Sequence, residues 1–316
     1  MAGDVIVTVT LNAALHVSYA AGDLSPDGVQ PISRPRYRAG GRGVTAARVL
    51  RSFGHDVLAA GLAGGTSGEL IREDLARSGV PTAFTVIRGE SRRVFRFTGP
   101  APAGQVLRFG EAGPYITTEE LGRFAADYRS LLAGAAAVVL CGSLPDGLPP
   151  EIYGTLVTYA VEAGVPVILD AGGEELRHAV SHGPDLVVAE TSSADPDLGA
   201  ALIRLGAAAA AVATGPLVSV VSAEGEWTAR VRTAAGDPPP LSVRGALVAG
   251  LVPGQLLGWS WPDRLRHALA LAAGGLGETG DRSAAVPTIS TSAVRDHVDL
   301  AAYERLLDAV TVERSS

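Results

Sequence analysis

The sequence contains no lysine, and its basic charge therefore rests on arginine and histidine. It also lacks a basic block, and its net charge is −7 at pH 7, so nucleic acids and anionic membranes are poor candidate partners. A single cysteine, Cys141, excludes an intrachain disulfide and a cysteine-rich zinc site. Its apolar runs are broken well before membrane-spanning length, and no basic region precedes the first of them. We expect a cytoplasmic protein.

Histidine is also sparse, and the six histidines suggest no metal cluster. His178 and His182 have the i, i+4 spacing that can hold zinc on a helix. Gly183 and Pro184 follow at once and no third ligand stands nearby, so we interpret both histidines as polar residues at a helix end. No metal ligand is predicted.

The chain does contain enough apolar sequence for a large core, with 316 residues of which 47% are hydrophobic. It opens on a β-rich run, Val5-Ile6-Val7-Thr8-Val9-Thr10, and then alternates between two patterns. Helical patterns lie at about 44–52, 67–78, 118–132, 150–163, 174–180, 196–205, 246–257 and 262–276. Short apolar runs typical of buried strands lie at about 57–60, 137–141, 165–170, 186–188, 209–214 and 217–222. This alternation predicts an α/β fold with a doubly wound, mostly parallel sheet.

Two extended regions with alternating polar residues interrupt that rhythm, at about 17–38 and 84–109. We interpret the chain as one domain, 1–316, with a small β lid inserted from about 13–39 and 84–110. The segment 299–307 is expected to be helical, and the last residues are expected to fray.

Ligands of doubly wound sheets bind beyond the carboxyl ends of the strands. Polar or glycine-rich segments follow several of the predicted strands there: Thr10-Leu11-Asn12, Cys141-Gly142-Ser143, Asp170-Ala171-Gly172 and Thr214-Gly215. A further glycine turn, Ala39-Gly40-Gly41-Arg42-Gly43, runs directly into a helix. Glycines admit a ligand to the backbone, a helix start supplies N–H donors, and Arg42 adds positive charge. This turn is a candidate anion site.

These segments stand in a particular order along the chain: Thr10-Leu11-Asn12-Ala13-Ala14-Leu15, the glycine turn, Gly89-Glu90-Ser91-Arg92, Gly142-Ser143-Leu144-Pro145-Asp146-Gly147 and Leu169-Asp170-Ala171-Gly172-Gly173. In that order and spacing the chain resembles the ribokinase-like (PfkB) carbohydrate kinases from about residue 5 to 277. Within them it is most similar to the 1-phosphofructokinase and tagatose-6-phosphate kinase branch. The resemblance implies a ribokinase-like domain whose β lid pairs with that of a second subunit. It also implies that ATP and Mg²⁺ are used to phosphorylate a sugar or sugar phosphate.

The same resemblance assigns substrate binding to Asn12, His16, Gly40, Gly41, Arg42, Thr45, Arg92 and Ser143. The family has Asp at the position of His16, Lys at that of Arg42 and Asn at that of Thr45. Two arginines near one pocket can grip a phosphate. The alternative is that Arg42 and Arg92 are solvated side chains and that His16 is a polar residue at the lid edge.

The nucleotide end departs further from the family. The resemblance assigns nucleotide binding to Glu190, Thr214 and Gly215. The family motif Lys-Pro-Asn-x-x-Glu reads Val188-Ala189-Glu190-Thr191-Ser192-Ser193 here, so its last carboxylate is lost. Glu190 could hold water near a metal, or it could be a surface carboxylate at a strand end.

The catalytic segment lacks its acid. Family members have Gly-Ala-Gly-Asp at a helix start, where backbone N–H groups hold phosphate charge and the Asp takes a proton. Here Ser242-Val243-Arg244-Gly245 occupies the place, with Gly245 at the base position, and no Asp or Glu occurs from 238 to 262. Asp237 is a low-ranked substitute, because the three prolines after it cannot supply first-turn amides. No catalytic residue is assigned.

Three hypotheses follow. The chain is an inactive or impaired kinase homologue, a pseudokinase, that binds a phosphorylated sugar or nucleotide in a regulatory role. Alternatively, it is an active hexose-phosphate kinase in which Asp237, Asp170 or the substrate's own phosphate replaces the missing base. As a third possibility, it is a dimeric scaffold that binds no ligand.

Overall fold

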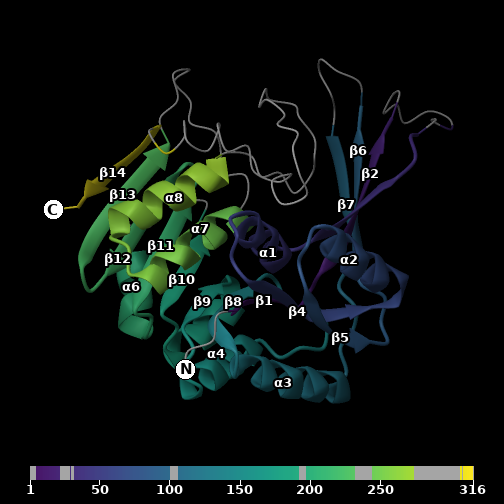
Figure 1. Cartoon of the computed structure of the whole chain (residues 1–316), viewed down its shortest axis with the longest axis horizontal. Helices are drawn as coiled ribbons and strands as arrows, with labels where there is room; N and C mark the ends of the chain where they lie inside the picture. Colours follow the sequence, from purple (N-terminus) through teal and green to yellow (C-terminus); the bar gives the residue numbers. More distant parts are fainter. Residues whose placement is uncertain are drawn as a thin grey trace.

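Short apolar strands assemble into one large twisted sheet at the centre of the molecule (Figure 1). The computed structural model describes residues 5–21, 29, 32–99, 106–191, 197–231, 244–273, 307 and 309–315. In these residues the large sheet has ten strands in the order β14-β13-β12-β11-β10-β9-β8-β1-β4-β5. Pairing is parallel from β5 through β11 and antiparallel from β11 to β14.

The parallel strands are near-continuous apolar runs because both of their faces are covered. In β1 (Val5–Thr10), for example, every residue after Val5 is buried. The other strands of this sheet are β4 (Val57–Gly64), β5 (Thr82–Ile87), β8 (Ala135–Cys141), β9 (Val167–Asp170), β10 (Leu186–Glu190), β11 (Ala209–Thr214), β12 (Leu217–Ser222), β13 (Gly225–Val231) and β14 (Val310–Arg314).

Helices cover both faces of the large sheet and form two apolar cores with it. One core contains α1 (Arg42–Ser52), α2 (Gly65–Arg77), α7 (Arg244–Leu257) and α8 (Trp261–Ala273). The other contains α3 (Thr118–Leu132), α4 (Ile152–Glu162), α5 (Gly173–Ala179) and α6 (Leu198–Leu205), with a short 3-10 helix, η1 (Val180–His182), after α5. The predicted α/β class with a doubly wound, mostly parallel sheet is confirmed. None of the helices in the described residues is long and apolar enough to cross a bilayer.

A second, four-stranded sheet projects from the first (Figure 1). It consists of β2 (Ala14–Ala20), β3 (Arg36–Gly40), β6 (Arg92–Thr98) and β7 (Val106–Gly110), in the order β3-β2-β6-β7. The predicted lid segment 84–110 begins too early, because residues 84–87 belong to β5, which pairs with β4 in the large sheet. The alternating pattern of β5 reflects an edge strand rather than a lid strand.

The carboxyl end of the chain also differs from expectation. Residues predicted to fray form β14, which pairs with β13, and Val310 is buried. The alternation Val310-Thr311-Val312 allows this segment to cover an edge of the large sheet. The helix predicted at 299–307 lies outside the described residues except for Leu307, which is helical.

Candidate functional site

Three residues predicted to bind substrate meet beyond the ends of β1 and β8. The Asn12 side-chain amide Nδ2 donates to the Leu144 carbonyl at 3.2 Å and to the Ser143 hydroxyl at 3.4 Å. Arg92, the first residue of β6, donates through Nε to the Asn12 carbonyl at 3.3 Å. The small sheet is thereby joined to the loops that follow β1 and β8 in the large sheet.

In the glycine turn before α1, close packing or backbone conformation accounts for each glycine. A Cβ at Gly40 would lie 2.3 Å from the imidazole of His16, and one at Gly43 would lie 2.5 Å from the Thr10 hydroxyl. Gly41, the N-cap of α1, has φ 121°, which favours glycine. Thus His16 covers Gly40, and the close approach of α1 to β1 accounts for Gly43.

An ion pair that sequence reasoning missed holds this turn in place. Arg48 of α1 pairs with Asp74 of α2 and donates through Nη1 to the Ala39 carbonyl at 2.6 Å. Asp74 in turn accepts from the Ala39 N–H at 2.7 Å. Burial lowers the pKa of Arg48 to about 10, against the opposing effect of Asp74, so the guanidinium stays charged at neutral pH. The only sequence signal was an arginine flanked by apolar residues, in the run Val44 to Leu50 of α1.

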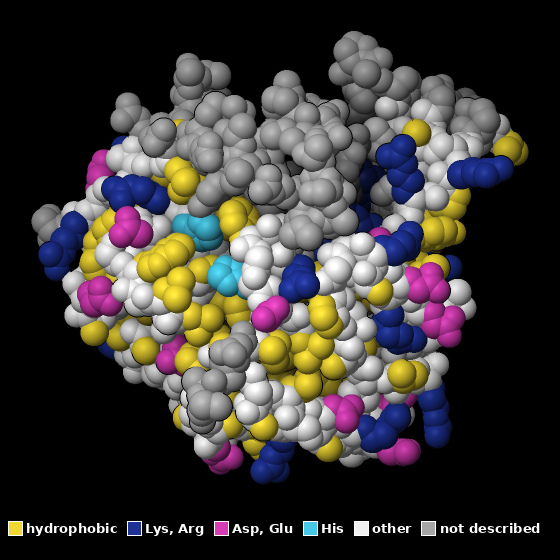
Figure 2. Space-filling view, in the orientation of Figure 1, with side chains coloured by type: hydrophobic (Ala, Val, Ile, Leu, Met, Phe, Trp, Pro, Cys, Tyr) yellow, Lys and Arg dark blue, Asp and Glu magenta, His cyan; other side chains and the backbone are white. Residues whose placement is uncertain are grey.

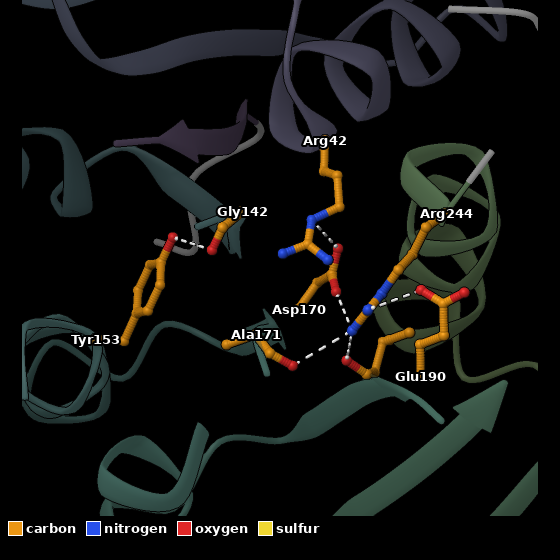
Figure 3. A network of polar contacts seen from close by, with 8 residues as sticks. Arg42, Gly142, Tyr153, Asp170, Ala171, Glu190 and Arg244 are labelled. Carbon is orange, nitrogen blue, oxygen red and sulfur yellow. Dashed lines mark hydrogen bonds and ion pairs between the residues drawn. The ribbon is translucent and has the colours of Figure 1, made fainter. Parts of the chain in front are cut away.

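Arg42 and Arg244 converge on one buried carboxylate (Figure 3). The Oδ2 of Asp170 lies 3.3 Å from Arg42 Nε, and its Oδ1 lies 2.5 Å from Arg244 Nη2. Arg244 also pairs through Nη1 with Glu190 Oε2 at 3.2 Å. Two positive and two negative groups therefore balance at the carboxyl ends of β9 and β10. Sequence reasoning placed Arg42 at a phosphate and Arg244 at a helix start, but it did not bring them together.

Asp170 is fully buried, and this burial affects the acidity of its carboxyl group. Burial raises the pKa of its carboxyl group, and the charges of Arg244 and Arg42 oppose that rise. Nearby, Tyr153 donates from its hydroxyl to the Gly142 carbonyl at 3.0 Å and so fixes the loop that carries Ser143 (Figure 3). Cys141 is completely buried, as expected for a small apolar residue, and burial raises the pKa of its thiol well above the usual range.

Gly245 lies where the helices α1 and α7 meet. A Cβ there would be 2.6 Å from the Arg42 carbonyl and 2.8 Å from the Cβ of Thr45. The position that the family resemblance gives to the base is thus filled by neighbouring backbone. Thr45 is buried beneath it and serves this helix contact.

The residues predicted to bind nucleotide lie at the end of β10 and at the hairpin between β11 and β12. Glu190 ends β10 and is 60% exposed at its side chain. Thr214 ends β11 opposite Leu217 of β12, and Gly215 and Pro216 form the turn between these strands, with Gly215 at φ 56°. This hairpin turn explains the glycine by its backbone conformation. Asp237 and the segment Ser242-Val243 lie outside the described residues.

Comparison with known proteins identifies the class to which this fold and site belong. The chain belongs to the pfkB family of carbohydrate kinases, whose family model matches residues 8–289. A tagatose-6-phosphate kinase of Staphylococcus epidermidis is 34% identical over 175 residues. That match spans 55% of this chain and 56% of the relative, so the chain covers about half the length of the curated relative it matches.

Solved structures agree with the fold over nearly the whole chain. A protein of Thermotoga maritima described as a possible 1-phosphofructokinase superposes with a TM-score of 0.82 at 22% identity, covering 99% of this chain and all of the other (100%). Phosphofructokinase-2 from Escherichia coli in complex with potassium superposes with a TM-score of 0.81 at 21% identity, covering 98% and 99% of the two chains. The expected ribokinase-like fold is confirmed.

Proposed function

We propose that this pfkB-family chain has lost its catalytic base, is inactive or strongly impaired as a kinase, and binds a phosphorylated sugar or a nucleotide in a regulatory role. The observation that carries the proposal is the environment of Gly245. A Cβ at position 245 would lie 2.6 Å from the Arg42 carbonyl oxygen, which is closer than van der Waals contact allows. An acidic side chain therefore does not fit at this position without a shift of α1 or α7.

The two neighbouring carboxylates do not take over the role of the base. A general base must reach the substrate hydroxyl and accept its proton. Asp170 is inaccessible to solvent, with one oxygen beside Arg42 and the other beside Arg244, and Glu190 is paired with Arg244. Removal of a general base typically costs about 10²–10⁴-fold in rate.

The small sheet, where the family resemblance places the sugar, favours an anionic ligand. In the register of the small sheet, the face that carries His16 and Arg92 also carries Arg36, Arg38, Arg96 and Arg108. Figure 2 shows dark-blue side chains gathered over this part of the molecule. Arginine is suited to phosphate by its fork of N–H donors. A hexose phosphate is the ligand class we assign, and phosphofructokinase-2 has been solved with fructose 6-phosphate.

ATP and Mg²⁺ are the cofactors of the family, and the described residues of this chain fit Mg²⁺ poorly. The oxygens of Asp170 and Glu190 surround the positive guanidinium of Arg244, which would repel a metal ion at the same place. We therefore assign no step of phosphate transfer to these residues. The competing hypothesis, an active kinase with a displaced base, requires Asp170 to leave its two arginines or Asp237 to reach the site.

Thermal unfolding with candidate ligands tests the binding half of the proposal, because a ligand that binds only the folded state must stabilise it. We expect fructose 1-phosphate, fructose 6-phosphate or tagatose 6-phosphate to raise the midpoint temperature of unfolding of the wild-type protein. Arg42→Ala should remove that rise. Arg266→Ala, a substitution at an exposed arginine of α8, is the control. The same measurement is made with ATP and ADP, and if neither the sugar phosphates nor the nucleotides raise the unfolding midpoint, the scaffold hypothesis is favoured instead.

A further inference from the structure

Four oxygen atoms surround the guanidinium of Arg244 (Figure 3). Its Nη2 lies 2.5 Å from Asp170 Oδ1, 2.9 Å from the Val188 carbonyl and 3.3 Å from the Ala171 carbonyl, and its Nη1 lies 3.2 Å from Glu190 Oε2. These oxygens come from the last residue of β9, from the residue after it, and from the middle and last residues of β10. The Arg244 side chain is only 15% exposed, so its charge is largely withdrawn from water.

The position of Arg244 is not explained by its own helix. It is the first residue of α7, where a positive side chain opposes the helix dipole. Nor does Asp170 need it as its only counter-ion, since Arg42 already lies 3.3 Å from the other oxygen. The remaining explanation for the position of Arg244 is that its positive charge matches a set of two carboxylates and two carbonyls.

Carboxylate and carbonyl oxygens at one point are the ligands that hard cations such as Ca²⁺ and Mg²⁺ take in proteins. We propose that Asp170, Glu190 and the carbonyls of Ala171 and Val188 form a cation site, and that the chain fills it with its own guanidinium. Arg244 is a built-in cation. While it is in place the site takes no divalent ion, and when it is shortened the site binds one.

This inference stands on the contacts of Arg244 alone and holds whether or not the protein transfers phosphate. It accounts for a buried carboxylate shared by two arginines, which would be costly to maintain without a cation on each side. It also gives a reason for Arg244 to stand at a helix start, where the resemblance places glycine.

Chemical rescue by a metal ion tests the proposal. Wild-type protein, Arg244→Ala and Arg244→Gln are unfolded thermally in CaCl₂ or MgCl₂ and in NaCl of equal ionic strength. We expect both variants to unfold at lower temperature than wild type in NaCl and to recover most of the loss in CaCl₂, with no specific response from wild type. Calorimetric titration with CaCl₂ should find one site in the variants, and Arg244→Ala combined with Glu190→Gln should bind at least about tenfold more weakly.

Arg266→Ala, which removes an exposed arginine, controls for general charge effects and should show no CaCl₂ response. Equal CaCl₂ effects on wild type and on the Arg244 variants would overturn the proposal, as would folded variants that ignore CaCl₂. If the variants do not fold in NaCl, refolding is compared in CaCl₂. Folding only with Ca²⁺ supports the site, and failure in both salts contradicts it.

Discussion

Gly245 is the residue whose surroundings bear most directly on activity, and a single methyl group probes them. In Gly245→Ala the added Cβ would lie 2.6 Å from the Arg42 carbonyl, so α1 or α7 must move. We expect unfolding in urea to show a loss of about 1–3 kcal/mol, typical of overpacking.

Gly122→Ala is the matched control, because Gly122 also lies in a helix but a Cβ there meets nothing within 4 Å. Alanine should be neutral at that position or stabilise α3 by up to about 1 kcal/mol. Equal effects of the two substitutions would contradict the close packing of α1 on α7.

At this scale the sequence predicted which residue types occupy the site but not how they pair. Arg42, Asn12, Ser143 and Arg92 were named in advance, and the structure brings the last three together. Asp170 and Arg244 are separated by 74 positions, and their contact depends on the packing of α7 against β9. No local pattern encodes such a pairing, so Arg244 could only be interpreted as an unfavourable charge at a helix start.

Among the elements, α3 shows how one side chain fixes a helix start and ties it to a strand. The Thr117 hydroxyl accepts from the Glu120 N–H, while Glu120 Oε2 accepts from the Thr117 N–H at 2.9 Å. Glu120 Oε1 also accepts from the Arg88 N–H at 2.7 Å. Burial alone would raise the pKa of Glu120, but these donors hold it below its ordinary value of 4.5.

Glu120→Gln should therefore destabilise the protein at pH 7, by about 1–2 kcal/mol, because a charged acceptor is lost. The folded pKa lies below the unfolded one, so this contribution is complete above about pH 4.5 and is lost as pH falls through the folded pKa. Urea unfolding from pH 7 to pH 3 should show the difference between variant and wild type shrinking. Glu119→Gln, an exposed neighbour, is the control; a pH-independent difference for Glu120→Gln would contradict the assignment.

Elements with a clear period were predicted well, and those that depend on distant partners were not. The helix expected at 118–132 coincides with α3, and each of the other predicted helical patterns corresponds to a helix. β13 was missed, although it forms a hairpin with β12 as well as pairing with β14. β14 was expected to fray, because it is stabilised by pairing with β13, a segment far along the chain. For the same reason β5 was assigned to the lid rather than to the edge of the large sheet.

For the whole molecule, the small sheet has a second face with exposed apolar side chains on both of its edge strands, β3 and β7. Phe109 is 57% exposed, Tyr37 44% and Leu107 43%, and the register places all three on the face opposite His16 and Arg92. Exposed apolar side chains gathered on one surface are typical of interaction sites.

We accordingly expect wild-type protein to be at least a dimer by light scattering after size-exclusion chromatography, and Phe109→Asp to reduce its mass to that of a monomer. A charge buried without a partner in an interface is costly. Leu205→Asp, at an exposed apolar residue of α6 away from the small sheet, should leave the mass unchanged. A monomeric wild-type protein, or a Phe109→Asp variant of unaltered mass, would contradict pairing through the small sheet.

Release of ADP from ATP and Mg²⁺ in the presence of fructose 1-phosphate, fructose 6-phosphate or tagatose 6-phosphate measures the central claim most directly. Purified wild-type protein is predicted to release no more ADP than a control without sugar phosphate. Turnover at about 1–100 s⁻¹, the ordinary range for kinases, would contradict the loss of the base. If Asp170→Asn or Asp237→Asn abolished that turnover, the substituted aspartate would be identified as the displaced base.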